Sequence, residues 1–177
     1  WYHADPNKGL DYDPDTVKKM VDQGQWVDPT LGHHLLGQEA KAKGEVGPMS
    51  PHWAVSFKVL PEAEHVETLM NMHDAGIRFT TGLDMGMAYG THDRSAASAW
   101  AFVETLGWPN WKAIHAATAG TAEALGLSQE VGGLRAGLVA DLAAFVGDPA
   151  TSILDMDRAE TVVQSGRVLK LGGTVLV

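Results

Sequence analysis

Two short stretches of the same pattern, residues 22–27 (DQGQWV) and residues 74–79 (DAGIRF), decide the fold. In each, a helical segment gives way to a glycine and then to a run of extended character, and glycine suits the left-handed conformation in which many helices end. This helix–glycine–strand unit occurs twice, and the offset from Asp22 to Asp74 is 52 residues. The repetition predicts an α/β architecture with parallel strands. Such units occur in barrels and in doubly wound sheets, and the repeat alone does not choose between them.

Each unit begins with a helix whose start is visible in the sequence. Asp13 can cap a first helix, because proline follows it at the favoured first helical position. A second helix starts at Pro61 and carries acidic residues in its first turn, where the helix dipole favours them. We therefore expect helices over 13–24 and 61–76, followed by a strand over 77–81.

The segment between the two units, residues 33–57, is long for a connection in a compact domain. It holds three glycines, two prolines and three of the eight histidines. This composition predicts either a functional loop or lid, or a flexible excursion.

The last third of the chain changes character. Beyond a glycine-rich loop up to Asp93, we expect helices over 95–106, 110–117 and 121–126. Short runs of β-like residues then alternate with glycine-containing turns. The expected strands cover 142–146, 161–164, 167–171 and 174–177, and they predict a small antiparallel appendage.

Composition excludes several classes of protein. The 177 residues carry a formal charge of −9, which argues against nucleic acid or an anionic membrane as partner. Cysteine is absent, which excludes disulfides and thiolate metal sites. No run approaches the roughly 20 apolar residues of a membrane span and no signal peptide is visible, so we expect a cytoplasmic location. The chain begins at Trp1, which predicts a processed chain or a piece of something longer.

Asp84 is the foremost candidate for chemistry. It follows the expected strand directly, in the stretch TTGLDMG at 80–86. In barrel enzymes, catalytic groups stand at the carboxyl ends of strands, where a carboxylate can bind a metal or exchange a proton with a metal-bound water. The alternative is an aspartate that caps a turn or a helix.

The histidines are candidates with strong structural alternatives. His33 and His34 could reach one site from a loop, and they could equally form polar surface. His92 could reach a substrate at a barrel mouth, or it could be a surface histidine. His65 and His73 lie among apolar helix positions, so we expect them to pack in or near the core. The sequence contains no His-Glu-x-x-His, no phosphate-binding glycine loop and no Gly-x-Ser-x-Gly.

Four ordered stretches resemble the metal-dependent amidohydrolases. Residues 76–84 (GIRFTTGLD) are similar to the last barrel strand of that family, and residues 111–127 to the helices that follow it. Residues 132–142 (GGLRAGLVADL) resemble its entry into a small β domain, and residues 147–149 with 162–167 fit the same template. The imidazolonepropionase-like and dipeptidase-like branches are the most similar.

The resemblance implies a fold and a domain organisation. The fold is the C-terminal part of a (β/α)₈ barrel, about its last two strand–helix units, followed by strands of a small β-sandwich built from both chain ends. It implies a barrel part over 1–129 and a sandwich part over 130–177. The family's His-x-His, its middle-strand Lys or Glu and its later histidines have no counterpart here, and a whole barrel needs about 250 residues. Asp141 would be structural, at the turn into the small domain.

The resemblance also implies hydrolysis of an amide, cyclic amide or peptide C–N bond by metal-activated water. One or two divalent ions, zinc by expectation, would be held mostly by ligands outside this chain. Asp84 would bind metal and carry a proton, while His33 and His92 would contact a small amide or peptide substrate. The missing barrel portion, or a second copy of the chain, would be the partner. The alternative is a non-catalytic structural or interaction module derived from such an enzyme.

Overall fold

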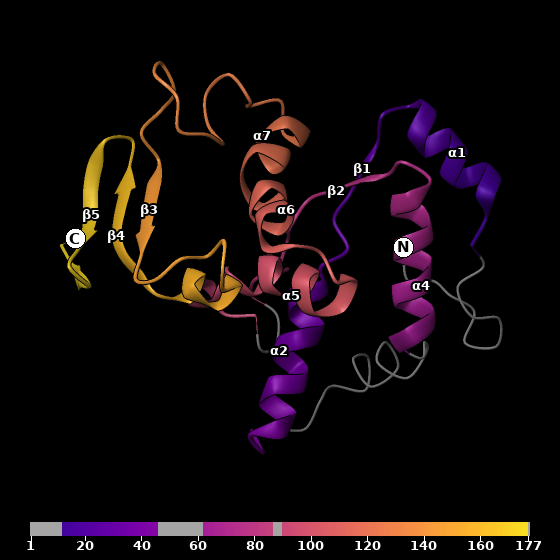
Figure 1. Ribbon diagram of the computed structural model, residues 1–177, viewed down its shortest axis with the longest axis horizontal. Helices are drawn as coiled ribbons and strands as arrows, with labels where there is room; N and C mark the ends of the chain where they lie inside the picture. Colours follow the sequence, from indigo (N-terminus) through magenta and orange to yellow (C-terminus); the bar gives the residue numbers. More distant parts are fainter. Residues whose placement is uncertain (1–11, 46–61, 87–89, 177) are drawn as a thin grey trace.

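The computed structural model describes residues 12–45, 62–86 and 90–176. Its first half combines two short strands with helices (Figure 1). The elements are α1 (Pro14–Asp22), β1 (Trp26–Val27), α2 (Leu31–Ala42), α4 (Glu62–Asp74) and β2 (Arg78–Phe79). No helix in the described part of the chain is both long enough and apolar enough to cross a membrane.

The repeated unit folds as the sequence predicts. Strands β1 and β2 are parallel neighbours, and Trp26 pairs with Arg78 in the register that the 52-residue offset requires. Asp13 caps α1 by accepting a hydrogen bond from the Asp15 amide at 3.1 Å. Gly24 follows the end of α1 with a φ of 65°, a conformation that costs glycine little. The predicted parallel α/β architecture is confirmed for the described residues.

Helix α2 contradicts the predicted loop over 33–57, because residues 31–42 are helical. The residues beyond 45 in that segment lie outside the described part. Gly32, in the first turn of this helix, permits close packing. A Cβ at Gly32 would lie 2.6 Å from Leu83 Cδ1 and 2.9 Å from the Ser98 amide nitrogen. Helix α2 therefore packs closely against the start of α5 (Ala97–Leu106).

The helices after α5 form one continuous rod instead of the two separate helices predicted over 110–117 and 121–126. Helix α6 (Asn110–His115) runs through a π turn (Ala116–Gly120) into α7 (Thr121–Ala124). Gly120, which lies between the two predicted helices, has helical angles of φ −64° and ψ −47°. The Thr121 hydroxyl donates to the carbonyl of Ala116 at 2.7 Å, which satisfies an acceptor that the wider turn exposes.

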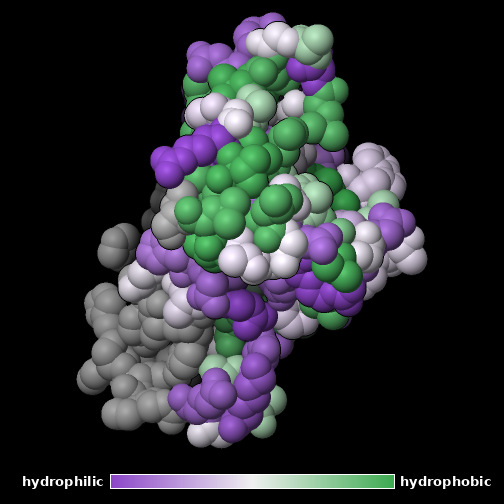
Figure 2. Space-filling model, turned by 90° about the vertical axis from the view of Figure 1, so that its left-hand side faces the viewer, coloured by the Kyte–Doolittle hydropathy of each residue, from purple (hydrophilic) through white to green (hydrophobic). Residues whose placement is uncertain are grey.

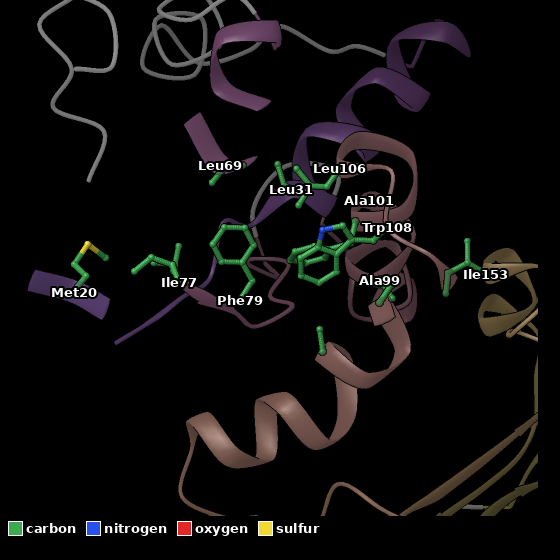
Figure 3. Packing of buried hydrophobic residues seen from close by; sticks show 14 of the residues in the cluster. Met20, Leu31, Leu69, Ile77, Phe79, Ala99, Ala101, Leu106, Trp108 and Ile153 are labelled. Atoms are coloured by element: carbon green, nitrogen blue, oxygen red, sulfur yellow. The ribbon is translucent and has the colours of Figure 1, made fainter. Parts of the chain in front are cut away.

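An aromatic cluster of His73, Phe79, Phe102 and Trp108 forms the centre of the core. Phe102 and Trp108 have ring centroids 4.8 Å apart, and the Phe79 ring is stacked on that of Trp108 at 6.1 Å. Figure 3 shows Phe79 beside Trp108, between residues of the surrounding helices. The predicted packing role of His73 is confirmed, because its ring lies 4.9 Å from that of Trp108. The cluster joins α4, β2 and α5 into one body.

The last third of the chain forms the predicted antiparallel sheet, in the order β3-β4-β5-β6. Its strands are β3 (Leu142–Phe145), β4 (Ala159–Gln164), β5 (Arg167–Leu171) and β6 (Thr174–Val175). Asp141 accepts a hydrogen bond from the Ser165 amide at 2.7 Å and so holds the β4–β5 hairpin, which agrees with its predicted structural role. The short helix η3 (Ile153–Asp157) connects the sheet to the core through buried Ile153.

The small sheet leaves large apolar side chains exposed. They include Leu142 on β3, Val168 and Leu171 on β5 and Val175 on β6. Figure 2 shows hydrophobic surface gathered on the side of the molecule where this sheet lies. Contiguous apolar surface of this kind is typical of a face that another structure covers.

Candidate functional site

Two aspartates stand at the carboxyl ends of the parallel strands. Asp28 follows β1 directly, and the loop of residues 80–86, which carries Asp84, follows β2. The ends of neighbouring parallel strands meet at one edge of a sheet, which is where open α/β folds and barrels place their ligands. We refer to Asp28 together with this loop as the carboxylate edge.

The Asp28 carboxylate binds the loop that carries Asp84. Its Oδ1 accepts hydrogen bonds from the amide of Gly82 at 3.0 Å and from the amide of Thr30 at 3.1 Å. The Thr80 hydroxyl donates to the same carboxylate. One side chain thus connects the end of β1, the start of α2 and the loop after β2.

The electrostatic environment of Asp28 disfavours its charged form. Burial of the carboxylate under the loop raises the pKa of Asp28 above its usual value, although the residue keeps an exposed outer side. The three hydrogen bonds lower the pKa, and the negative charge of Asp84 raises it again. The net direction is upward, as expected when two carboxylates share one edge.

Asp84 is exposed at this edge and has unusual backbone geometry. Its φ is 54°, in the left-handed region that residues other than glycine seldom adopt. The loop closes just beyond it, where the Gly86 amide donates to the carbonyl of Gly90 at 2.9 Å. An aspartate side chain without cover can reach solvent, a metal ion or a substrate.

The two predicted histidines take different places. His33 lies on α2 and is 6% exposed, and its Cδ2 would be 3.3 Å from a Cβ on Gly90. It therefore packs beneath the loop that follows Asp84. His92 is exposed in the short helix η1 (His92–Arg94), between that loop and α5.

An ion-pair network fixes η1 to the rest of the molecule. Arg94 lies 2.9 Å from Glu39 on α2 and 3.8 Å from Asp157 in η3. Hydrogen bonds from Lys43 and Arg94 lower the pKa of Glu39, and the bond to Glu39 raises the pKa of Arg94. The segment that carries His92 is thus attached to both α2 and η3.

The carboxylate edge fits part of a metal site. Carboxylate oxygens are ligands for zinc and for harder divalent cations. In residues 12–45, 62–86 and 90–176, however, no three histidines, aspartates or glutamates form a group that could hold an ion. Asp84 could supply one ligand, and a full set would require donors beyond the described residues.

Asp28 is the residue of this edge that the sequence analysis missed. The signal was present, because the repeat aligns residues 26–27 with 78–79 and so places Asp28 at the same strand end as the loop of Asp84. What the repeat did not reveal is the contact between Asp28 and Gly82, which joins residues 54 positions apart.

Comparison with known proteins assigns a family. The model of the amidohydrolase family matches residues 3–169. Among curated proteins no significant match was found.

Several solved structures have a similar fold. A Xaa-Pro dipeptidase with methionine bound in its active site superposes with a TM-score of 0.70 at 23% identity, covering 89% of this chain and 37% of its own. A prolidase complexed with N-methylphosphonate-L-proline gives 0.69 at 28% identity, covering 90% of this chain and 38% of its own. The ochratoxinase of A. niger gives 0.66 at 21% identity, covering 91% and 35%.

The chain spans little more than a third of the length of these structures. The coverage agrees with the predicted fold, a partial barrel followed by strands of a small β domain. The predicted relationship to the amidohydrolases is confirmed by the match over residues 3–169. The chain belongs to the amidohydrolase family.

Proposed function

We propose that this chain is part of a metal-dependent hydrolase that cleaves an amide or peptide C–N bond, with Asp84 as a metal ligand and proton carrier. The observation that supports this most directly is the exposed Asp84 carboxylate at the carboxyl edge of two parallel strands. That edge is the position of catalytic groups in barrel enzymes. Family membership gives the reaction class, which is hydrolysis.

A divalent ion, zinc by preference, would supply a water of lowered pKa and polarise the substrate carbonyl. Asp84 would accept the proton that the water loses as its oxygen attacks the carbonyl carbon. When the C–N bond breaks, Asp84 would return the proton to the departing nitrogen, so that a carboxylic acid and an amine leave. Its exposure is compatible with both transfers.

The similarity to a prolidase at 28% identity supports a dipeptide or another small acyl amide as substrate. His92, exposed beside the loop, would contact the substrate. His33, the other residue that we predict to bind substrate, would act from beneath Gly90. We propose these two roles together with that of Asp84.

We also propose the division into a barrel part over 1–129 and a small composite β-sandwich over 130–177. The exposed apolar side chains of β3, β5 and β6 support it, because a second sheet would remove them from water. The rest of the barrel and the covering strands would come from a longer polypeptide or from a partner chain.

The test supplies the missing barrel segment by fusion or co-expression, loads the protein with zinc and measures hydrolysis of Xaa-Pro dipeptides and simple N-acyl amino acids. Asp84→Asn should lower kcat by about 10²–10⁴-fold, the usual range for loss of an acid–base group. Asp93→Asn is the matched control, because Asp93 is exposed nearby in η1. Near-normal turnover by Asp84→Asn would overturn the role of Asp84. A chain that folds alone and stays inert after reconstitution would favour the non-catalytic alternative.

A further inference from the structure

We propose that Asp28 is a positioning residue that fixes the loop of residues 80–86 and thereby places the Asp84 carboxylate for reaction. The inference rests on the proposed function of Asp84 and adds to it a second residue with a different task. Asp28 acts through the loop, without contact to substrate.

Asp28 holds the loop of residues 80–86 through hydrogen bonds to its backbone, and we call this arrangement the clamp. Its carboxylate accepts from the amide of Gly82, which lies two residues before Asp84, and from the amide of Thr30. The Thr80 hydroxyl is a third donor. Because these bonds attach the Asp28 carboxylate to the backbone on both sides, we assign it the task of positioning and leave proton transfer to Asp84.

Gly82 leaves room for this carboxylate because it has no Cβ. A Cβ at Gly82 would lie 1.9 Å from Asp28 Oδ2 and 2.5 Å from Asp28 Cγ. No side chain fits there while Asp28 is in place. Glycine at this position therefore allows the loop backbone to lie directly on the carboxylate.

The loop requires such a clamp because Asp84 adopts an unfavourable backbone conformation. A left-handed conformation is unfavourable for a residue other than glycine, so contacts on both sides of Asp84 are needed to stabilise it. On the far side, the bond from Gly86 to Gly90 closes the loop at 2.9 Å. On the near side, the hydrogen bond from the Gly82 amide to Asp28 fixes the loop. Asp84 lies between these two fixed points.

The chain offers a matched control for removal of the carboxylate. Asp148 forms the same Asp-Pro turn, with its Oδ1 accepting from the Ala150 amide at 3.0 Å, as Asp28 accepts from Thr30 at 3.1 Å. Asp148 lies in the turn after β3, far along the chain from the loop of Asp84. Asp148→Ala therefore reports the cost of losing such a turn without loss of the clamp.

The experiment uses the reconstituted protein described above. Asp28→Ala should lower kcat by about 10- to 100-fold, as loss of an outer partner commonly does, with KM changed by less than about threefold. Hydrogen exchange at the Gly82 amide should become faster, which is a readout independent of activity. Asp28→Asn keeps an oxygen acceptor for both amides, so most of the activity and protection should return. Asp148→Ala should change none of these quantities.

A double-mutant cycle tests the contact itself. Gly82→Ala alone should damage activity because its Cβ meets the carboxylate. In the Asp28→Ala background the same change should cost much less, because the obstructing atoms are gone. Equal costs in the two backgrounds would overturn the proposed contact.

The outcomes separate this inference from the proposed function. If Asp84→Asn is inactive and Asp28→Ala keeps normal kcat with an unchanged Gly82 exchange rate, the clamp is wrong and the role of Asp84 stands. If Asp84→Asn is fully active, the proposed function fails whatever Asp28 does.

Discussion

The ammonium group of Lys112 lies 2.6 Å from Nε2 of His73. On the other side of that ring, Nδ1 lies 3.3 Å from the carbonyl oxygen of Ile77, and a carbonyl can only accept. Nδ1 therefore carries the proton, and Nε2 accepts from Lys112. The same ammonium lies 3.9 Å from the centroid of the Trp108 ring. A half-buried cation thus closes one edge of the aromatic cluster.

This arrangement makes the free energy of unfolding depend on pH through Lys112. Burial lowers the pKa of Lys112 below its ordinary 10.5, and the charge of Asp74 offsets this only in part. Between the folded and unfolded values the unfolded chain binds more protons, so stability rises with pH up to about 10.5. Lys112→Met should make that slope shallower in urea unfolding measured from about pH 8 upward. Lys18→Met, on the exposed face of α1, should leave the slope unchanged.

Replacement of Trp108 tests the aromatic cluster. Trp108 is 7% exposed, so Trp108→Ala should lower the free energy of unfolding by about 3–5 kcal/mol, through lost burial and the cavity left behind. Trp111, three residues later and in helix α6, is 65% exposed. Trp111→Ala should cost less than about 0.5 kcal/mol. Denaturant unfolding followed by circular dichroism measures both, and similar losses would contradict the described core.

Gly32 controls the separation of α2 and α5. A Cβ there would meet the Ser98 amide at 2.9 Å and the Ala97 carbonyl carbon at 3.0 Å, and backbone atoms cannot move aside as a flexible side chain can. Gly32→Ala should therefore destabilise the protein by about 1–3 kcal/mol, despite the better helix propensity of alanine. Gly133→Ala is the control, because its Cβ would come no nearer than 3.9 Å to Leu138. Thermal unfolding of the two variants distinguishes a packing requirement from a general sensitivity to glycine replacement.

The stabilisation that Glu39 provides through Lys43 and Arg94 should be lost in acid. Lys43 and Arg94 hold the pKa of Glu39 below its ordinary 4.5, so the stabilisation is present above pH 4.5 and is lost as the pH falls through the folded value. Glu39→Gln should lower stability near neutral pH, and the difference from the parent should shrink below pH 4.5. Glu104→Gln removes a charge from an exposed site on α5 and serves as the comparison. A difference that stays constant with pH would contradict this ion-pair assignment.

The sequence determined whatever depends on neighbours along the chain. The helix–glycine–strand repeat predicted parallel strands with Trp26 and Arg78 at equivalent positions, and the structure pairs these two residues in neighbouring strands. The turn at Ser165–Gly166 gave the β4–β5 hairpin, because both residues accept positive φ. The position of Asp84 in the segment after β2 was predictable for the same reason, since the end of a strand can be read locally.

Only the tertiary structure decided the rest. The glycines, prolines and histidines of residues 33–57 predicted a loop, yet residues 31–42 form helix α2, and Gly32 in that helix allows its close contact with Ser98. Nor does the local sequence reveal that Asp28 accepts a hydrogen bond from the amide of Gly82, which is 54 positions away. Residue propensity and hydrophobic periodicity describe local conformational preference. Contacts such as that of Asp28 with Gly82 depend instead on which distant backbone lies next to a side chain after the helices have packed.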